Sequence, residues 1–186
     1  MKQTFLTFLF AAILMLSSAM AQDKYFTKSG HISFFSSTPM ENIEGNNTTA
    51  SSVLDARTGK MEFAVLMKAF KFEKALMEEH FNENYVESGK YPKATFAGTV
   101  TNFSGVDLKK NGTYKVNVKG NLTIHGVTKE VEAPGTITVE NGQIKANSVF
   151  TVNPEDYKIE IPKLVREKIA KQIKVTVDMD YQPLKS

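Results

Sequence analysis

Three histidines and a group of neighbouring carboxylates are the side chains in this sequence most able to do chemistry. Histidine changes its charge near neutral pH and binds metal ions, and carboxylates act as general acids and bases. His80 lies within the run Glu78–Glu83, which contains three glutamates. His31 and His125 are distant from it in sequence, and no two histidines have the one-turn spacing of helical metal ligands. A metal or acid–base site around His80 is therefore one hypothesis.

The spacing of these acids favours a second interpretation, a solvated helix face. Glu79 and Glu83 are four residues apart and share one side of a helix, whereas Glu78 falls off that line. His31 and His125 fall on the polar faces of predicted strands, where we expect both rings to be exposed to solvent. We therefore expect a protein that is not an enzyme, with no catalytic residue, no metal ligand and no cofactor.

Other classes of site lack the residues that they need. The chain contains no cysteine, so it has no thiolate metal site, no cysteine nucleophile and no disulfide. No serine stands in a nucleophile-elbow pattern, and no glycine-rich loop has the spacing that cradles a phosphate. The 23 lysines and arginines are interleaved with 20 acidic residues. Because nucleic-acid-binding proteins gather their cations into a stripe or patch, we expect no nucleic-acid partner.

Most of the chain alternates between apolar and polar residues, which is the pattern of half-buried strands. The alternation is clearest in Tyr114–Ile124, Ile144–Val152 and Ile173–Tyr181. Residues typical of turns separate such stretches: Gly30, Gly45–Asn47, Thr58–Gly59, Ser88–Gly89, Asn111–Gly112, Gly135 and Asn141–Gly142. The pattern predicts an all-β, mainly antiparallel protein of about eight strands. A sheet of this size closes to remove its edges, and an eight-stranded barrel has room for one small ligand.

Two segments depart from this alternation. Residues Phe63–Phe72 are nearly all apolar, which predicts a strand covered on both faces. Lys74–Tyr85 is predicted as the covering helix, because Met77, Phe81 and Tyr85 form a stripe at a spacing of four residues. Pro92 requires an extended residue before it, so this helix ends earlier. A second short helix is predicted to open at Pro162 and to run through Ile169.

The N-terminus has the pattern of a secretory signal peptide. Lys2 precedes the apolar run Phe5–Leu16, and Ala19-Met20-Ala21 forms a small-x-small cleavage site. The apolar run is shorter than the ~20 residues that span a bilayer. We therefore expect residues 1–21 to be a signal peptide and residues 22–186 to form a single domain. The protein is expected to be exported, to the periplasm or as a secreted protein, with no transmembrane segment in the mature chain.

Three sequence blocks carry a resemblance to a known family. Gly120–Lys129, with the pattern Gly-x-Leu-Thr-Ile-x-Gly-x-Thr-Lys, resembles the signature strand pair of the YceI-like family. His80-Phe81 followed by Tyr91–Gly98 is similar to the family's helix and returning strand, and Phe150–Ile159 is similar to its late strand and corner. The blocks occur in family order, and the match runs from about Gly30 to Tyr181.

This resemblance implies a lipocalin-like, extended antiparallel barrel with a helix laid against it. It also implies export, and an amphiphilic lipid with a long polyisoprenoid chain as the ligand of the barrel interior. The inward strand faces would then line the cavity, with candidate ligand-binding residues Phe34, Phe63, Val65, Met67, Phe96, Leu122, Ile124, Phe150, Ile159 and Val175.

Two segments depart from the family pattern, and both would reshape a barrel mouth. Met40–Asn46 is more polar than the corresponding family strand, and Pro162–Lys171 is longer and more helical. A further alternative is an envelope stress or accessory protein that binds another protein through a sheet edge or through the helix after Pro162. The sequence leaves the oligomeric state open, with a homodimer as one possibility.

Overall fold

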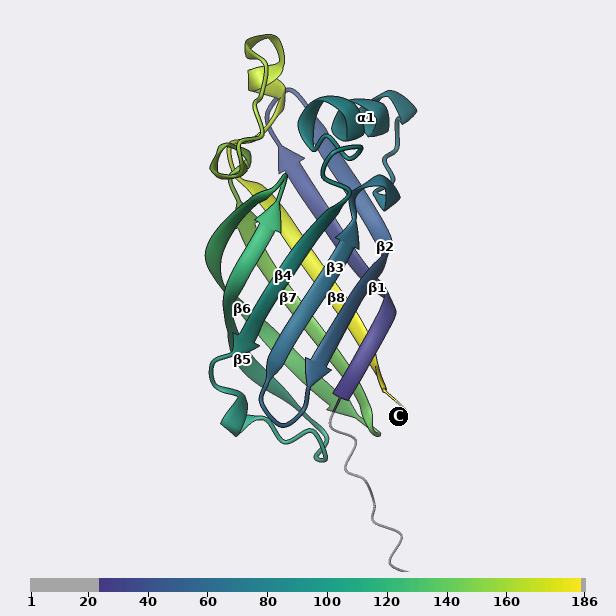
Figure 1. Cartoon of the computed structure of the whole chain (residues 1–186), viewed down its shortest axis with the longest axis vertical. Helices are drawn as coiled ribbons and strands as arrows, with labels where there is room; N and C mark the ends of the chain where they lie inside the picture. The colour runs from purple at the N-terminus through teal and green to yellow at the C-terminus, as the bar shows by residue number, and fades with distance from the viewer. Residues whose placement is uncertain (1–23, 185–186) are drawn as a thin grey trace, which may run out of the picture.

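The computed structural model describes residues 24–184, which form a closed barrel of eight antiparallel strands (Figure 1). Each strand pairs with its neighbour in the sequence, and β8 returns to pair with β1. The predicted class, a lipocalin-like antiparallel β-barrel, is confirmed. The strands are β1 Lys24–Ser37, β2 Asn42–Asp55, β3 Lys60–Leu66, β4 Lys93–Val100, β5 Gly112–Ile124, β6 Val127–Glu140, β7 Gln143–Val152 and β8 Ile173–Pro183.

Local turn chemistry and one bulge set the register of the strands. The hairpin between β5 and β6 turns through His125 and Gly126, whose φ angles of 51° and 72° suit a tight two-residue hairpin turn. Strand β1 has two register shifts against β2, one between Thr27 and Gly30 and one between Gly30 and Ile32. At the first shift, which places an extra residue on β1, the buried side of β1 changes from Thr27 to the alternating residues that begin at Gly30.

One end of the barrel, which we call the closed end, is filled by side chains. Leu54, Val139, Ile144 and Tyr181 are at most 4% exposed there. The hydroxyl groups of Tyr181 and Ser52 share a hydrogen bond of 2.7 Å. Burial raises the pKa of Tyr181 to about 12, because the tyrosinate would lose its hydration.

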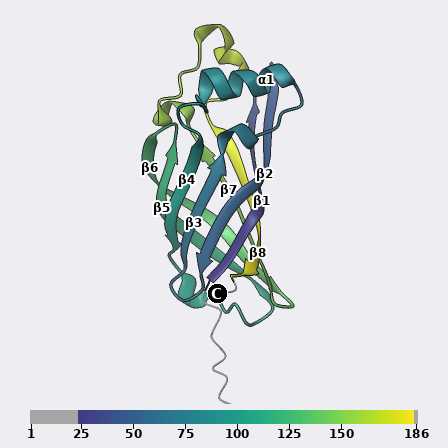
Figure 2. The ribbon, with the colours of Figure 1, turned by 45° about the vertical axis from the view of Figure 1, so that its right-hand side comes forward.

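The predicted helix lies over the opposite end, which we call the open end (Figures 1 and 2). It consists of α1, Ala75–His80, continued by a π-helical turn, Phe81–Tyr85. Phe81 packs against Phe34, Phe70 and Phe72, with ring centroids 5.1–5.6 Å apart. These four phenylalanines, the aromatic cluster, attach the helix to the barrel.

The prediction that this helix covers the outer face of a long strand was wrong. Strand β3 ends at Leu66, and Met67–Ala69 form a 3-10 turn, η1. The buried side chains of Met67 and Phe70 therefore point into the barrel mouth rather than toward a second layer. The apolar run reflects a strand followed by a buried turn.

Short 3-10 turns lie in the β4–β5 and β7–β8 connections. These are η3 Phe103–Gly105, η4 Pro154–Tyr157 and η5 Lys163–Lys168. The second predicted helix is η5, which is a 3-10 helix, and no side chain caps its N-terminus. Within residues 24–184, no helix has the length and apolar character needed to cross a membrane. The predicted signal peptide, residues 1–21, lies outside the described residues.

Candidate functional site

The barrel contains a cavity of about 590 Å³ that extends from the open end toward the closed end. This volume falls within the range of ~300–1,000 Å³ that small-molecule sites commonly have. Side chains from all eight strands line its wall, β2 through Ile43 alone, together with α1, the π-helical turn and the segment around η5. The four residues that fill the closed end do not line the cavity, so it stops short of that end.

All ten side chains predicted to line a cavity lie on its wall: Phe34, Phe63, Val65, Met67, Phe96, Leu122, Ile124, Phe150, Ile159 and Val175. Strand alternation places eight of them there, because successive residues of a strand point to opposite faces of the sheet. Met67 lies in η1 and Ile159 follows η4, so these two reach the wall from connecting segments. The structure contains no ligand, so their contribution to binding stays a prediction. Other inward residues with the same alternation were outside the ten candidates: Ile32, Met61, Val116, Val118, Ala133, Ile137, Ala146, Val177 and Met179.

A second set of wall residues comes from the segments around the open end. Leu76, Met77 and Tyr85 reach the cavity from the helix, and Ile161, Val165 and Ile169 reach it from the η5 segment. The helical stripe in the sequence could have indicated the first set. The second set has no regular spacing, since it belongs to a loop with one 3-10 turn.

Two glycines shape the wall between β4 and β5. Gly98 pairs directly with Gly120, and the ring of Phe96 lies over both. A Cβ atom on Gly120 would stand 2.4 Å from the Cα of Gly98 and 2.7 Å from Cζ of Phe96. The glycines therefore let the Phe96 ring lie close to the sheet, where it meets Phe63 edge to face at 5.9 Å.

The charged residues on the wall come from segments at the open end. They are Glu41, Lys74, His80 and Lys168. Glu41 and Lys74 form an ion pair of 3.7 Å between the β1–β2 hairpin and the start of the helix. The cavity can thus surround an apolar chain along its length, and it offers charges to a polar group only at the opening.

His125 joins three segments at the open end, and the expectation that its ring is exposed was wrong. The side chain is 10% exposed. Nδ1 is hydrogen-bonded to the carbonyl oxygen of Tyr157 at 3.1 Å, and Nε2 is hydrogen-bonded to a carboxylate oxygen of Glu87 at 2.6 Å. The ring also meets Tyr91 edge to face at 4.5 Å. His125 therefore links the β5–β6 turn to η4 and to the loop after the helix.

The hypothesis of a metal or acid–base site around His80 gains no support from the geometry. Among residues 24–184, no group of three histidine, aspartate or glutamate side chains is arranged to hold a metal ion. Glu78 instead pairs with Lys71 at 2.6 Å, and Glu79 and His80 are exposed on the helix.

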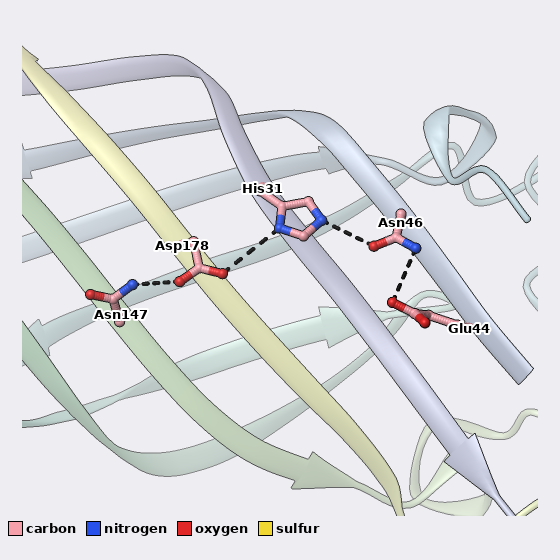
Figure 3. Close-up of polar contacts among 5 residues, drawn as sticks. All are labelled: His31, Glu44, Asn46, Asn147 and Asp178. Carbon is pink, nitrogen blue, oxygen red and sulfur yellow. Dashed lines mark hydrogen bonds and ion pairs between the residues drawn. The ribbon is translucent and has the colours of Figure 1, made fainter. Parts of the chain in front are cut away.

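His31 belongs to a polar network on the outside of the barrel (Figure 3). Its Nε2 bonds Oδ1 of Asn46 at 3.0 Å, and its Nδ1 is 3.7 Å from a carboxylate oxygen of Asp178. Asn147 donates to Asp178, and Asn46 donates to Glu44 at 3.2 Å. The network connects β7, β8, β1 and β2 across the outer surface. His31 and Asp178 are about two-fifths exposed, as expected for the polar face of a strand.

Comparison with protein families identifies the chain. Residues 24–181 match the family model of the YceI-like domain. The chain belongs to the YceI-like family. Comparison with curated proteins gave no match.

Solved structures share the YceI-like fold. A polyisoprenoid binding domain from Saccharophagus degradans, implicated in plant cell wall breakdown, is 15% identical with a TM-score of 0.76, over 87% of this chain and 99% of that one. BcnA from Burkholderia cenocepacia is 17% identical with a TM-score of 0.68, over 82% and 96% of the two chains. The YCEI protein of Campylobacter jejuni is 18% identical with a TM-score of 0.57, over 76% and 85%. At these identities the similarity demonstrates the fold.

Proposed function

We propose that this YceI-like protein is an exported carrier that holds a long-chain amphiphile, polyisoprenoid-like in character, in its barrel. The observation that carries the proposal is the cavity, a tube with an apolar wall, a filled floor and charged groups only at its opening. The apolar chain would lie along the barrel, and the polar head would remain near Lys74, His80 and Lys168. This role requires no catalytic group.

The energetics of an apolar tube fit a ligand with a long chain. Each methylene buried from water contributes about 0.8 kcal/mol, so ten contribute about 8 kcal/mol before ordering costs. Such a wall recognises length and flexibility rather than a pattern of hydrogen bonds. The description of the Saccharophagus degradans neighbour as a polyisoprenoid binding domain supports an isoprenoid chain, and the pattern of residues 1–21 supports export.

A substitution that fills the cavity with a large side chain tests the proposal directly. Ala133 is a buried wall residue in the middle of β6, and Glu132 is exposed on the opposite face of the same strand. Ala133→Trp should displace the chain, whereas Glu132→Trp should leave it bound. The measurement is mass spectrometry of organic extracts from each natively purified variant. The carrier function is supported if the wild type and Glu132→Trp retain a stoichiometric long-chain lipid, and if Ala133→Trp folds but has lost that lipid. Equal lipid in both variants, or none in the wild type, would count against it.

The alternative of partner binding through a sheet edge meets a structural obstacle. The eight strands close on one another, so each described strand has a neighbour on both sides. Only parts of strands pair on a single side, such as Val127–Pro134 of β6, which pairs with β5 alone. Partner binding through a sheet edge, which the sequence left open, would have to use such a partial edge.

A further inference from the structure

The rim of the open end carries unusually exposed apolar side chains. Met40 on the β1–β2 hairpin is 61% exposed, Leu76 on α1 is 60% exposed and Leu164 on η5 is 94% exposed. These are the three most exposed of the large apolar residues between positions 24 and 184. A single exposed leucine is ordinary, but these three come from the segments that surround one opening (Figures 1 and 2).

The segment that carries Leu164 is also basic. Residues 163–171 contain four cations and only one acid, Glu167. All four cations are exposed, and none pairs with a carboxylate of the described residues: Lys163, Arg166, Lys168 and Lys171.

The charges on the other side of the opening differ. Glu41 and Glu78 are neutralised there by Lys74 and Lys71, whereas Glu73 and Glu79 are exposed on the helix side. Glu155, Asp156 and Glu160 precede η5 in the same connection, so the excess of positive charge on this side of the rim is confined to residues 163–171.

The same segment is continuous with the cavity. Ile161, Val165 and Ile169 point to the cavity wall, while Leu164 between them points to solvent. One short loop thus presents apolar groups both outward and inward. A lipid chain that leaves a bilayer beside Leu164 would meet apolar side chains without crossing water.

We propose that the rim docks on the surface of an anionic lipid bilayer, with Leu164 inserted among the lipids and the cations of residues 163–171 at the headgroups. An apolar residue flanked by cations is the arrangement that binds membrane interfaces. The inference rests on the proposed function, because it identifies where a lipid ligand would enter. We propose a bilayer rather than a protein as the surface that the rim binds, because the cations form no ordered pairs and the apolar residues are separated around an opening.

The test is flotation with lipid vesicles, using the protein recovered from the envelope of an expression host with its N-terminus read by mass spectrometry. The vesicles are phosphatidylcholine alone or phosphatidylcholine with 30 mol% phosphatidylglycerol. We expect at least tenfold stronger partitioning onto the anionic vesicles at low salt, and weakening as salt is raised. Leu164→Asp should lower this partitioning at least tenfold. The Lys163→Glu, Arg166→Glu double variant should abolish the preference for anionic vesicles.

Val149→Asp is the matched control, since Val149 is 52% exposed on the outer wall of β7. It should partition as the wild type does. Equal partitioning of Leu164→Asp and Val149→Asp onto the vesicles would overturn the proposal. It would also be overturned if the wild-type protein did not float with the vesicles, or if the rim only joined two copies of the protein into a dimer. Lipid content, measured on the same preparations, separates the two proposals. Leu164 does not line the cavity, so Leu164→Asp should keep its bound lipid even when docking is lost.

Discussion

Phe81 is the side chain through which the helix is attached to the barrel, so Phe81→Ala should loosen the open end. Its ring lies 5.2 Å from Phe34, 5.6 Å from Phe70 and 5.1 Å from Phe72. Each aromatic pair contributes about 0.5–1.5 kcal/mol beyond simple burial, and truncation of a fully buried phenylalanine to alanine costs about 3–5 kcal/mol. Because Phe81 is half-buried, we expect the variant to lose about 2–3 kcal/mol of these contacts.

This loss should appear mainly as local opening. The contacts of Phe81 hold the helix rather than the strands, so 2 kcal/mol raises the open population about thirtyfold. Two measurements follow. Hydrogen exchange of residues 75–86 should accelerate by about that factor. The dissociation of a fluorescent long-chain polyene fatty acid into excess vesicles, followed by stopped flow, should accelerate similarly.

The control is Phe103→Ala, at the closed end. Phe103 is also half-buried, and it packs over Gly59 in the β2–β3 turn and away from the cavity. Its loss should lower the free energy of unfolding without changing the dissociation rate. If Phe81→Ala dissociates the probe at the wild-type rate while exchange over residues 75–86 is faster, the helix does not gate the cavity. Equal acceleration by both variants would show that release follows global stability.

Two further predictions concern the wall and the closed end. Gly120→Ala should lower the free energy of unfolding in urea by about 1–3 kcal/mol, because its Cβ would meet the backbone of Gly98 at 2.4 Å. Gly105→Ala, where no atom lies within 4 Å, should leave it within about 0.5 kcal/mol. Tyr181 titrates near 12 in the folded barrel and near 10.0 when unfolded. Its contribution is complete below pH 10 and falls by about 3 kcal/mol between pH 10 and 12, since only the unfolded chain ionises there. Tyr181→Phe should flatten that decline in urea titrations, and an unchanged slope would contradict the assignment.

The wall of the cavity was predictable because it follows from a local rule. In β5, β7 and β8 the polar and apolar residues alternate, so the inward face can be identified without knowing the fold. Four of the ten predicted wall residues come from these strands: Leu122, Ile124, Phe150 and Val175. The closed topology then turns these faces toward one interior.

Glycines were predicted less well. Gly30, Gly45 and Gly135 suggested turns, yet all three lie inside strands. Each makes room for a group distant in sequence, and at Gly45 a Cβ would stand 2.5 Å from the ring of Phe34. A sequence shows that a residue lacks a side chain, but it does not show which distant atom occupies the space.

The contacts at the open end could not be predicted from local sequence patterns. His125 seemed to belong to the polar side of a strand, but it occupies a tight turn, and its partners are 32 and 38 residues away in sequence. The residue range of the helix was predicted, but the surface against which it packs was not. Its apolar stripe could pack on the outer face of a sheet as well as over the mouth of a barrel. Tertiary contacts alone, above all those of Phe81, decide between these positions.

The two ends of the barrel use different interactions, and this difference bears on function. The closed end joins its strands through side chains that are almost fully buried, including the hydrogen bond between Ser52 and Tyr181. The open end is joined through loops, with half-exposed aromatic contacts and the hydrogen bonds of His125. Local opening requires the least free energy where apolar contacts are few and exposed. A ligand in this tube should therefore enter and leave beside the helix, at the same end that carries Leu164 and the unpaired cations.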